Sequence, residues 1–480
     1  MDFFSVIMFL GLYYIRPQEW SAVASKLQPV QLSMVLAIIA MVMKYRKRPF
    51  LKELFRTPHD WIVLTYFIWV IGTAPDVSGT FSQAYSFLLF YLVTVQALAN
   101  IERIQTYLNW WSFFIFAVVL MALAGEFQIW DPMNSYDLTH GWMKGRLILR
   151  TSIFNNPNAL GHSVVPLIVM LYFNLFWKRP VFVKVALIPI MLFPLYCIYL
   201  TLSKGAFLTG FATIISALTY RRPKTVQLLI YVTAFTMGFA ALKTLPRMHE
   251  LDQAQTEGGI QGRVVAFKWG FEKLTGQLTG IGYQRFVWDF RNEHGYWKAP
   301  HSSYVQIGAE LGFPGLFLFL GILYCCIRTL LTAKTTDVAE ERVRRLLFVL
   351  LISFMVSSWM VGWSYRASFF LMAAVIAAFH RQMLLRAEAA QNKITEATPE
   401  PTVVISIDGK DSPVRRPEDI TGAPAPSNKP KPNRFAATEY EAEVVNPGIR
   451  WNRLGWMDFA LISGMLITTV RFWKYVMQNI

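Results

Sequence analysis

The chain has 480 residues, of which 54% are hydrophobic and 15% aromatic, and only 16% are charged. This composition is too apolar for a soluble domain of this length. The apolar residues come in blocks of about 17–22, the length that crosses a bilayer core of about 30 Å as a helix. The sequence therefore predicts an all-α, polytopic membrane protein, a helical bundle with about 12–13 transmembrane helices. The expected spans are 2–15, 29–43, 60–75, 81–99, 107–125, 159–177, 183–202, 205–220, 226–242, 304–327, 345–363, 366–382 and 456–476.

The formal net charge of +16 suggests nucleic acid as one class of partner, but its distribution argues against this. The positive residues gather in short loops between spans, as the positive-inside rule describes, and no basic stripe with interleaved aromatic residues is present. If the N-terminus is cytoplasmic, all of these loops fall on one side of the membrane, and loops 126–158 and 243–303 fall on the other. The basic loops are 44–56, 178–184, 221–224 and 334–345.

Two further features narrow the class of protein. The three cysteines, Cys197, Cys325 and Cys326, lie within apolar segments, so neither a disulfide framework nor a zinc-type spacing is available. The first twenty residues lack a basic leading region and a small-residue cleavage site, which favours a first span over a removed signal.

The chain divides by composition into four parts. Residues 1–144 form an N-terminal transmembrane region, and residues 145–386 form a core that contains the long loop 243–303. Residues 387–450 are rich in Pro, Ser and charge, with too few large apolar residues to offset the entropy of ordering, so we expect a disordered cytoplasmic segment. Residues 451–480 hold an apolar stretch that reads as an appended final transmembrane helix.

Three polar breaks fall on the same side of the predicted bundle. The first, "GRLILRTSIFNNPNALGHS" (145–163), contains an Asn-Pro-Asn turn and helix-cap signal, and the second, "LTLSKGAFL" (200–208), carries Lys204 between two spans. The third, "HSSYVQIGAELGFPG" (301–315), opens a span with a His and interrupts it with Gly-Phe-Pro-Gly. Polar residues at these depths cost free energy in hydrocarbon, so they indicate a functional surface.

Loop 243–303 contains "IQGRVVAFKWGFEKL", in which Val264, Phe267, Phe271 and Leu274 recur at helical spacing. This pattern predicts an amphipathic helix lying at the membrane interface. Arg263 stands near its start, and His301 stands at the start of a transmembrane helix. Helix N-termini favour anions, and arginine presents a planar fork of donors suited to phosphate. The pattern therefore indicates a basic pocket at the membrane surface that binds a lipid diphosphate.

The motifs "TLSKGAFLTG", "GRVVAFKWGFEKL", "LTGIGYQRF" and "HSSYVQIGAELGFPGLFLFL", in this order and preceded by "SIFNNPNALGH", resemble the core of the O-antigen ligase and polymerase superfamily. The resemblance covers roughly residues 145–330. The N-terminal "YIRPQEW" is similar to the corresponding region of exosortase-associated O-glycosylation ligases.

The resemblance implies an inverting, metal-independent glycosyltransferase without a cofactor. It implies a bacterial inner-membrane enzyme whose active site faces the periplasm. The enzyme would transfer a glycan from undecaprenyl diphosphate to an acceptor hydroxyl in surface polysaccharide or lipopolysaccharide synthesis. Its expected partners are the lipid-linked donor, membrane lipids and a lipid, glycan or protein acceptor, without nucleic acid.

The same resemblance assigns roles to particular residues. The family's proposed base matches His301, and its diphosphate-binding arginine matches Arg263. A second family arginine aligns with Lys204, which keeps the charge and loses the bidentate fork. The sequence adds further candidate diphosphate contacts, namely Arg146, Arg150 and Arg285.

Each candidate also has a structural interpretation. His301 and Lys204 could mark helix boundaries, Arg263 could be an interfacial anchor, and the three loop arginines could be ordinary surface charges. His162 and Glu310 are expected to be satisfied helix residues. Stacking of a sugar on Trp269, Tyr283 or Trp297 stays open.

Two alternatives to a ligase also stay open. A polymerase of polysaccharide repeat units would use the same chemistry with a second glycan as acceptor. A secondary transporter is the less favoured alternative, because transporters pair broken helices at mid-membrane in repeated halves, whereas the polar breaks here crowd one side.

Overall fold

A computed structural model describes residues 2–45, 55–244, 258–397, 449 and 451–479. In this part of the chain the regular elements are helices and no strand is formed, so the predicted all-α fold is confirmed. The first half contains α1 (Asp2–Ile15), η1 (Pro17–Glu19), α2 (Ala22–Leu27), α3 (Pro29–Tyr45), α5 (Pro58–Gly72), α6 (Val77–Ala97), α7 (Ile101–Glu126), α8 (Ser135–His140), α9 (Pro157–Leu171) and the π-helical turn η2 (Tyr172–Phe176). The second half contains α10 (Val181–Leu200), α11 (Lys204–Thr219), α12 (Lys224–Thr244), α13 (Gly258–Gly276), α14 (Phe286–His294), α15 (Ser303–Thr332), α16 (Val338–Ser357), α17 (Ala367–Ala397) and α19 (Trp456–Asn479).

Each expected span coincides with one of these helices, because apolar blocks and helix caps mark the same boundaries. Asn100 caps α7 through the backbone N–H of Arg103, and Asn156 with Pro157 opens α9 as the turn signal predicts. By length and apolar composition, five described helices could cross a membrane. They are Ile101–Glu126, Pro157–Phe176, Val181–Leu200, Ser303–Thr332 and Ala367–Asn392. The protein is therefore a multi-pass membrane protein, and the total of 12–13 spans stays a prediction.

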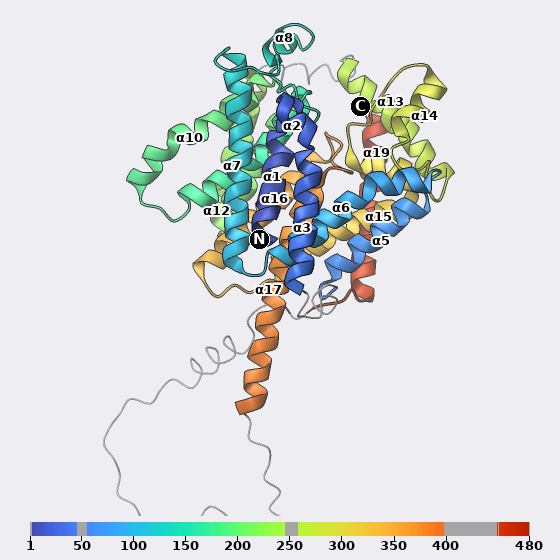
Figure 1. Cartoon of the computed structure of the whole chain (residues 1–480). Coiled ribbons are helices and arrows are strands. Elements are labelled where there is room, and N and C mark those ends of the chain that lie inside the picture. Colours follow the sequence, from blue (N-terminus) through green and yellow to red (C-terminus); the bar gives the residue numbers. More distant parts are fainter. Residues whose placement is uncertain (1, 46–54, 245–257, 398–448, 450, 480) are drawn as a thin grey trace, which may run out of the picture.

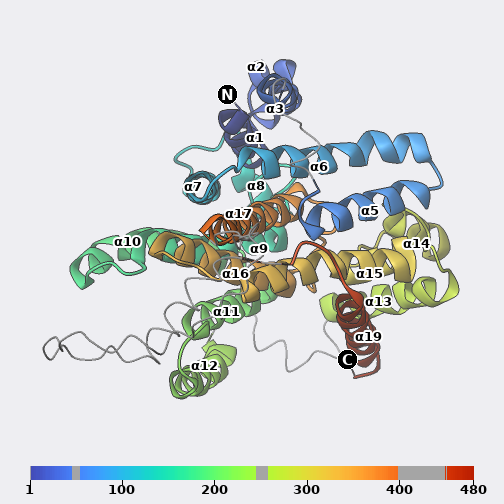
Figure 2. The same cartoon turned by 90° about the horizontal axis from the view of Figure 1, so that it is seen from below.

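The long loops gather at one end of the bundle. Figure 1 shows α8, α13 and α14 together at the top, whereas α17 extends from the opposite, lower end. Viewed from below, α9, α16 and α17 lie in the middle of the bundle, and α3, α10, α12 and α19 lie at its edges (Figure 2). Loop 126–158 and the described part of loop 243–303, residues 258–303, therefore share an end, as the charge pattern predicted.

The boundary expected at residue 387 is wrong, because it falls inside a helix. α17 continues without interruption to Ala397, so residues 387–397 are helical. Ala, Glu, Gln and Lys dominate this stretch, and these are strong helix formers. The remainder of the segment expected to be disordered, 398–448 and 450, lies outside the described residues.

Helix α15 is kinked where the sequence reads Gly-Phe-Pro-Gly. Gly312 adopts a left-handed φ of 68°, and a Cβ at this position would collide with the carbonyl of Leu278. The carbonyl groups around the kink accept hydrogen bonds from other elements, since Ile281 and Gly282 donate their N–H groups to Ala309 and Glu310. The Trp69 indole donates to Leu311 at 2.9 Å. The interruption therefore docks the loop after α13 onto α15 without leaving buried carbonyls unpaired.

The last helix, α19, packs against the rest of the bundle, and its expected role as a final transmembrane helix stays a prediction. At its lower end Asp458 accepts hydrogen bonds from Tyr324 and Arg328 of α15, both at 2.5 Å. At its upper end the fully buried Trp473 donates its indole N–H to the carbonyl of Phe267 in α13 at 3.1 Å. The helix thus connects α15 to α13.

Candidate active site

His301 lies at the upper end of α15, where the backbone is held on both sides. Its φ is 50°, and the next residue, Ser302, caps α15 by accepting from the N–H of Val305. Ser303 donates its N–H to the carbonyl of Ser358 at 2.7 Å, and its hydroxyl accepts from the N–H of Trp363 at 2.8 Å. The loop between α16 and α17 therefore fixes the chain on which the imidazole is mounted.

Arg263 lies on α13, whose apolar face packs against protein. The predicted stripe is confirmed, because Val264, Phe267 and Leu274 are buried. The stripe faces α15 and α19, and its expected location at the membrane interface stays a prediction. Gly270 shows how close the packing is, since a Cβ there would lie 2.9 Å from Val305 and 3.3 Å from Trp473.

Lys204 is the first residue of α11, and the preceding Ser203 caps the helix by accepting from the N–H of Ala206. The neighbouring Gly205 fills a narrow gap, because a Cβ there would lie 2.7 Å from Nε2 of His162 and 2.9 Å from Sδ of Met360. The other imidazole nitrogen of His162, Nδ1, lies 3.0 Å from Oγ of Ser357. The start of α11 thus abuts α9 and the loop after α16.

Electrostatics connect these parts. The pKa of His301 is lowered from its ordinary value of 6.5 to about 4. Burial is the main cause, and the positive charges of Arg263 and Lys298 contribute in the same direction. The imidazole is therefore neutral near pH 7 and able to accept a proton. Arg263 also acts electrostatically on His162, so it lies within range of both histidines.

The structure thus places Arg263 within electrostatic range of His301 and of His162. Lys204 lies near them, because the next residue, Gly205, packs against His162. Sequence reasoning missed Lys298, whose ammonium packs against Gly262, the residue before Arg263. The sequence signal that could have identified Lys298 as a site residue was its position three residues before His301. His162 was expected to be a helix residue whose polar atoms are paired within the fold, and the hydrogen bond between its Nδ1 and Ser357 fits this expectation. Its Nε2 faces Gly205 at the start of α11.

Arg146 holds two helix ends next to this group. Its Nε donates to the carbonyl of Thr201 at 3.1 Å, and its terminal nitrogen donates to Oδ1 of Asn158 at 2.9 Å. Thr201 is the last-turn cap of α10 and Asn158 stands in the first turn of α9. Arg146 therefore positions the polar breaks, and a direct diphosphate contact stays a prediction.

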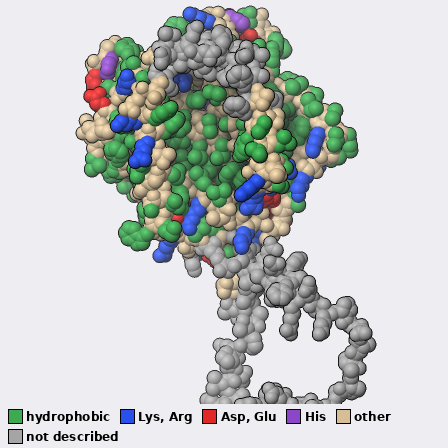
Figure 3. Space-filling model, turned by 180° about the vertical axis from the view of Figure 1, so that it is seen from behind, with side chains coloured by type: hydrophobic (Ala, Val, Ile, Leu, Met, Phe, Trp, Pro, Cys, Tyr) green, Lys and Arg blue, Asp and Glu red, His purple; other side chains and the backbone are tan. Residues whose placement is uncertain are grey.

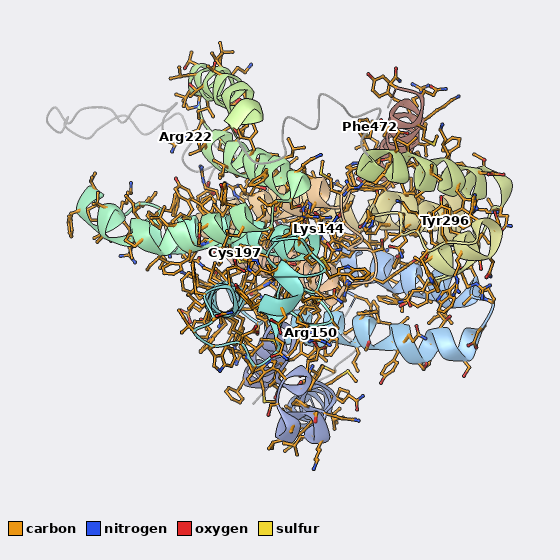
Figure 4. The ribbon with its side chains drawn as sticks, turned by 90° about the horizontal axis from the view of Figure 1, so that it is seen from above. Lys144, Arg150, Cys197, Arg222, Tyr296 and Phe472 are labelled. Carbon is orange, nitrogen blue, oxygen red and sulfur yellow. The ribbon has the colours of Figure 1, made fainter. Side chains whose placement is uncertain are left out.

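Arg150 and Arg285 are both exposed, and their partners within the described residues lie away from His301. Arg285 forms an ion pair with Asp289 at 2.9 Å, one helical turn along α14. The backbone of Arg150 donates to Oγ of Ser135, next to α8. Viewed from above, Arg150 lies on the α8 side of this end and Tyr296 on the α14 side (Figure 4). Their predicted roles in substrate binding stay predictions.

The three aromatic residues considered for sugar stacking differ in exposure. Trp269 and Tyr283 are buried, and the indole N–H of Trp269 donates to Glu293 at 2.7 Å. Trp297 is 49% exposed and meets Trp288, which is 57% exposed, at 4.7 Å between ring centroids. The guanidinium of Arg291 lies 4.2 Å from the centroid of Trp297. This aromatic pair is thus open at the end of the molecule that carries His301.

An open, polar cavity of about 350 Å³ lies one helical turn beyond His301. Its lining combines α15 with the loop before α17 and consists of Gln284, Gln306, Gly362, Tyr365 and Arg366. Among the described residues, no group of three or more His, Cys, Asp or Glu side chains is arranged to hold a metal ion.

The fold defines a multi-pass helical membrane protein, in which Arg263 and Lys298 act electrostatically on the imidazole of His301 at one end of the bundle. Residues 189–320 match the family model described as O-antigen ligase. This match confirms the predicted resemblance to the O-antigen ligase and polymerase superfamily, and the matched range includes Lys204, Arg263 and His301 but neither Arg146 nor Arg150. No curated protein matches the chain.

Proposed function

We propose that the protein transfers a glycan from a polyprenyl diphosphate to an acceptor hydroxyl, on the periplasmic face of the bacterial inner membrane. The single observation that carries the proposal is the location of the neutral imidazole of His301 within electrostatic range of Arg263. A proton acceptor next to a phosphate-binding cation is what displacement of a diphosphate by a hydroxyl requires.

In the proposed reaction the acceptor oxygen forms a bond to the anomeric carbon while the bond from that carbon to the diphosphate oxygen breaks. The hydroxyl proton moves to Nε2 or Nδ1 of His301, and the bonding electron pair leaves with the diphosphate. Attack from the side opposite the leaving group inverts the anomeric centre. Arg263, Lys204 and Lys298 bind the diphosphate and stabilise the charge that develops on it. Neither a metal ion nor a cofactor is required by this scheme.

Bound diphosphate also tunes the base. Burial, together with the two neighbouring cations, holds the pKa of His301 near 4 in the free protein, and a diphosphate between the cations would offset their part of this effect. The pKa of the imidazole then returns toward its ordinary value, where a general base is most effective near neutral pH. The donor would thus activate the base that acts on the acceptor.

The polyprenyl tail needs an apolar surface that leads to the same end. Figure 3 shows a hollow on the rear face of the molecule, in which hydrophobic side chains gather. α12 and α19 stand apart on this face in the views from below and from above (Figures 2 and 4). Phe472 of α19 meets Trp359 at 4.8 Å between ring centroids, and Trp359 meets Tyr304 of α15 at 4.6 Å. This aromatic contact connects the hollow to the first turn after His301, and we assign the tail to it.

The test uses the purified protein in lipid nanodiscs with a labelled glycan on undecaprenyl diphosphate. His301→Gln should reduce transfer by about 10²–10⁴-fold, the usual contribution of a general base. His140→Gln is the matched control, since His140 lies at the same end on α8 and is exposed. Full activity of the His301 variant, with the control equally active, would refute the mechanism.

The acceptor decides between a ligase and a polymerase. We favour a ligase, which transfers a finished chain, and the alternative is a polymerase that joins repeat units. Loss of a ligase leaves long chains on the lipid carrier, whereas loss of a polymerase leaves single repeats. A transporter would move substrate into sealed vesicles in the absence of a lipid-linked glycan, and the grouping of all polar breaks at one end argues against it.

A further inference from the structure

A second cavity lies at the lower end of the bundle, away from His301. It is bounded by the start of α5, the middle of α15, the middle of α17 and the start of α19, and it encloses about 670 Å³. This volume falls within the range of about 300–1,000 Å³ that is typical of small-molecule sites. We call it the lower groove. Its lining residues are Phe55, Arg56, Pro58, Trp61, Ile62, Thr65, Phe317, Leu318, Leu384, Glu388, Asn452, Arg453, Leu454 and Phe459.

The walls of the lower groove are apolar and face outward from the bundle. Trp61 is 55% exposed and Phe459 is 43% exposed, although both lie on helices within the membrane protein. Phe317 stacks in parallel with Phe459, with 6.4 Å between their ring centroids. These walls suit a hydrocarbon chain, and they give a water-soluble anion little to bind.

The mouth of the lower groove is basic. Arg56 pairs with Glu388 at 3.1 Å, and the exposed Arg453 adds a second guanidinium. Two guanidiniums against one carboxylate leave a net charge of +1 at the mouth. Arginine suits a phosphate because its fork of N–H groups matches phosphate oxygens.

We propose that the lower groove binds an anionic glycerophospholipid of the inner leaflet. The phosphate lies at Arg56 and Arg453, and an acyl chain lies along Trp61, Phe317 and Phe459. The location fits, because basic loop 44–56 ends at this groove and such loops face the cytoplasmic leaflet, which carries the anionic lipids. The site does not depend on glycan transfer, and it lies at the opposite end from the proposed active site.

The experiment follows Trp61 as a reporter. The full chain is placed in phosphatidylcholine nanodiscs that contain a rising fraction of brominated phosphatidylglycerol, because bromine quenches indole fluorescence on contact. The contribution of Trp61 is the difference between the wild-type protein and Trp61→Phe. We expect this contribution to be quenched at a low fraction of phosphatidylglycerol and to saturate.

The charge requirement is tested with Arg56→Gln/Arg453→Gln. This variant should need about 30-fold more phosphatidylglycerol for the same quenching. Each basic residue near the membrane surface contributes about 1 kcal/mol to lipid binding. The two residues together contribute about 2 kcal/mol, and a tenfold change in affinity corresponds to about 1.36 kcal/mol. Arg56→Lys/Arg453→Lys should retain most of the binding. The matched control is Arg179→Gln/Arg222→Gln, which removes two exposed charges from other basic loops and should behave as wild type.

Three results would overturn the proposal. Equal quenching by brominated phosphatidylcholine would show ordinary contact with bulk lipid. Relief of quenching by millimolar inorganic phosphate would show a site for free anions. Unchanged quenching in the folded Arg56→Gln/Arg453→Gln variant would show that the two guanidiniums do not bind the headgroup.

Discussion

The carboxylate of Glu310 accepts a hydrogen bond from the backbone N–H of Phe286, with 3.0 Å between oxygen and nitrogen. Phe286 is the first residue of α14, so a side chain of α15 satisfies a donor that a helix N-terminus leaves unpaired. Gln306 donates to the same carboxylate at 3.4 Å. Glu310 therefore anchors the short helix that carries Trp288, one ring of the exposed aromatic pair.

Replacement of this carboxylate tests its structural role. Glu310→Ala should lower the free energy of unfolding by about 1–3 kcal/mol, because it leaves a buried N–H without an acceptor. Glu310→Gln retains a carbonyl oxygen and should cost less. Thermal unfolding in detergent measures both variants. A variant with alanine that is as stable as the one with glutamine would contradict the anchoring role.

The narrow gap at Gly205 gives a second prediction. Gly205→Ala should reduce glycan transfer at least tenfold, because its Cβ would push against His162 and Met360 at 2.7 and 2.9 Å and displace the start of α11. Gly210→Ala is the matched control on the same helix. Its Cβ would meet only Val165, at 3.9 Å, so normal activity is expected there. Similar losses in both variants would indicate a general effect on α11.

The charge of Lys298 gives a prediction about pH. It is one of the groups that lower the pKa of His301 to about 4, so Lys298→Gln should raise that pKa. The acid limb of kcat/KM, which reports the free enzyme, should therefore move to higher pH. Lys268→Gln, an exposed position on α13, serves as control. An unshifted limb in the Lys298 variant would argue against His301 as the titrating base.

The depressed pKa of His301 also affects stability. The neutral imidazole is favoured in the folded protein, so this contribution is fully present above the ordinary value of 6.5 and is lost as the pH falls toward 4. We expect the difference in melting temperature between wild type and His301→Gln to change in this interval, with the wild type losing stability on acidification relative to the variant.

The kink of α15 predicts a large effect of one methyl group. Gly312→Ala should destabilise the fold by about 3 kcal/mol or more, because a residue with a side chain is strained at φ 68° and its Cβ would collide with Leu278. Gly464→Ala in α19 is the control, since a Cβ there meets nothing within 4 Å and alanine favours a helix. Chemical unfolding followed by circular dichroism would measure both.

The exposed pair of Trp288 and Trp297 tests glycan contact. If sugars of the substrate stack on these rings, Trp288→Ala/Trp297→Ala should raise KM for the glycan about tenfold and leave kcat nearly unchanged, as expected for binding away from the reacting atoms. Trp142→Ala, an 80% exposed residue near α8, is the matched control. A loss confined to kcat would point to a structural role for the pair.

Much of the fold could be predicted from the sequence, because apolar block length and capping residues are local signals. Asn156-Pro157 marked the start of α9, and the spacing of Val264 and Phe267 marked the buried face of α13. The pairing of Arg285 with Asp289 was also readable, since residues four apart share a helix face.

The contacts between distant segments could not be predicted in this way. The sequence placed Arg263 and His301 at two helix starts on the same side of the bundle, and the family resemblance assigned them to one site. No spacing rule gives the distance between two residues that are 38 positions apart on different helices. The Glu310–Phe286 bond and the contact of Gly205 with His162 depend on how helices pack.

Trp473 inserts its ring between Gly270 of α13 and Gly308 of α15, so α19 helps to seat the helix that bears Arg263. A premature stop codon after residue 450 would leave His301 and every proposed diphosphate-binding residue in the product. We nevertheless expect such an allele to be null, because the truncated enzyme would lack the indole that spaces those two helices.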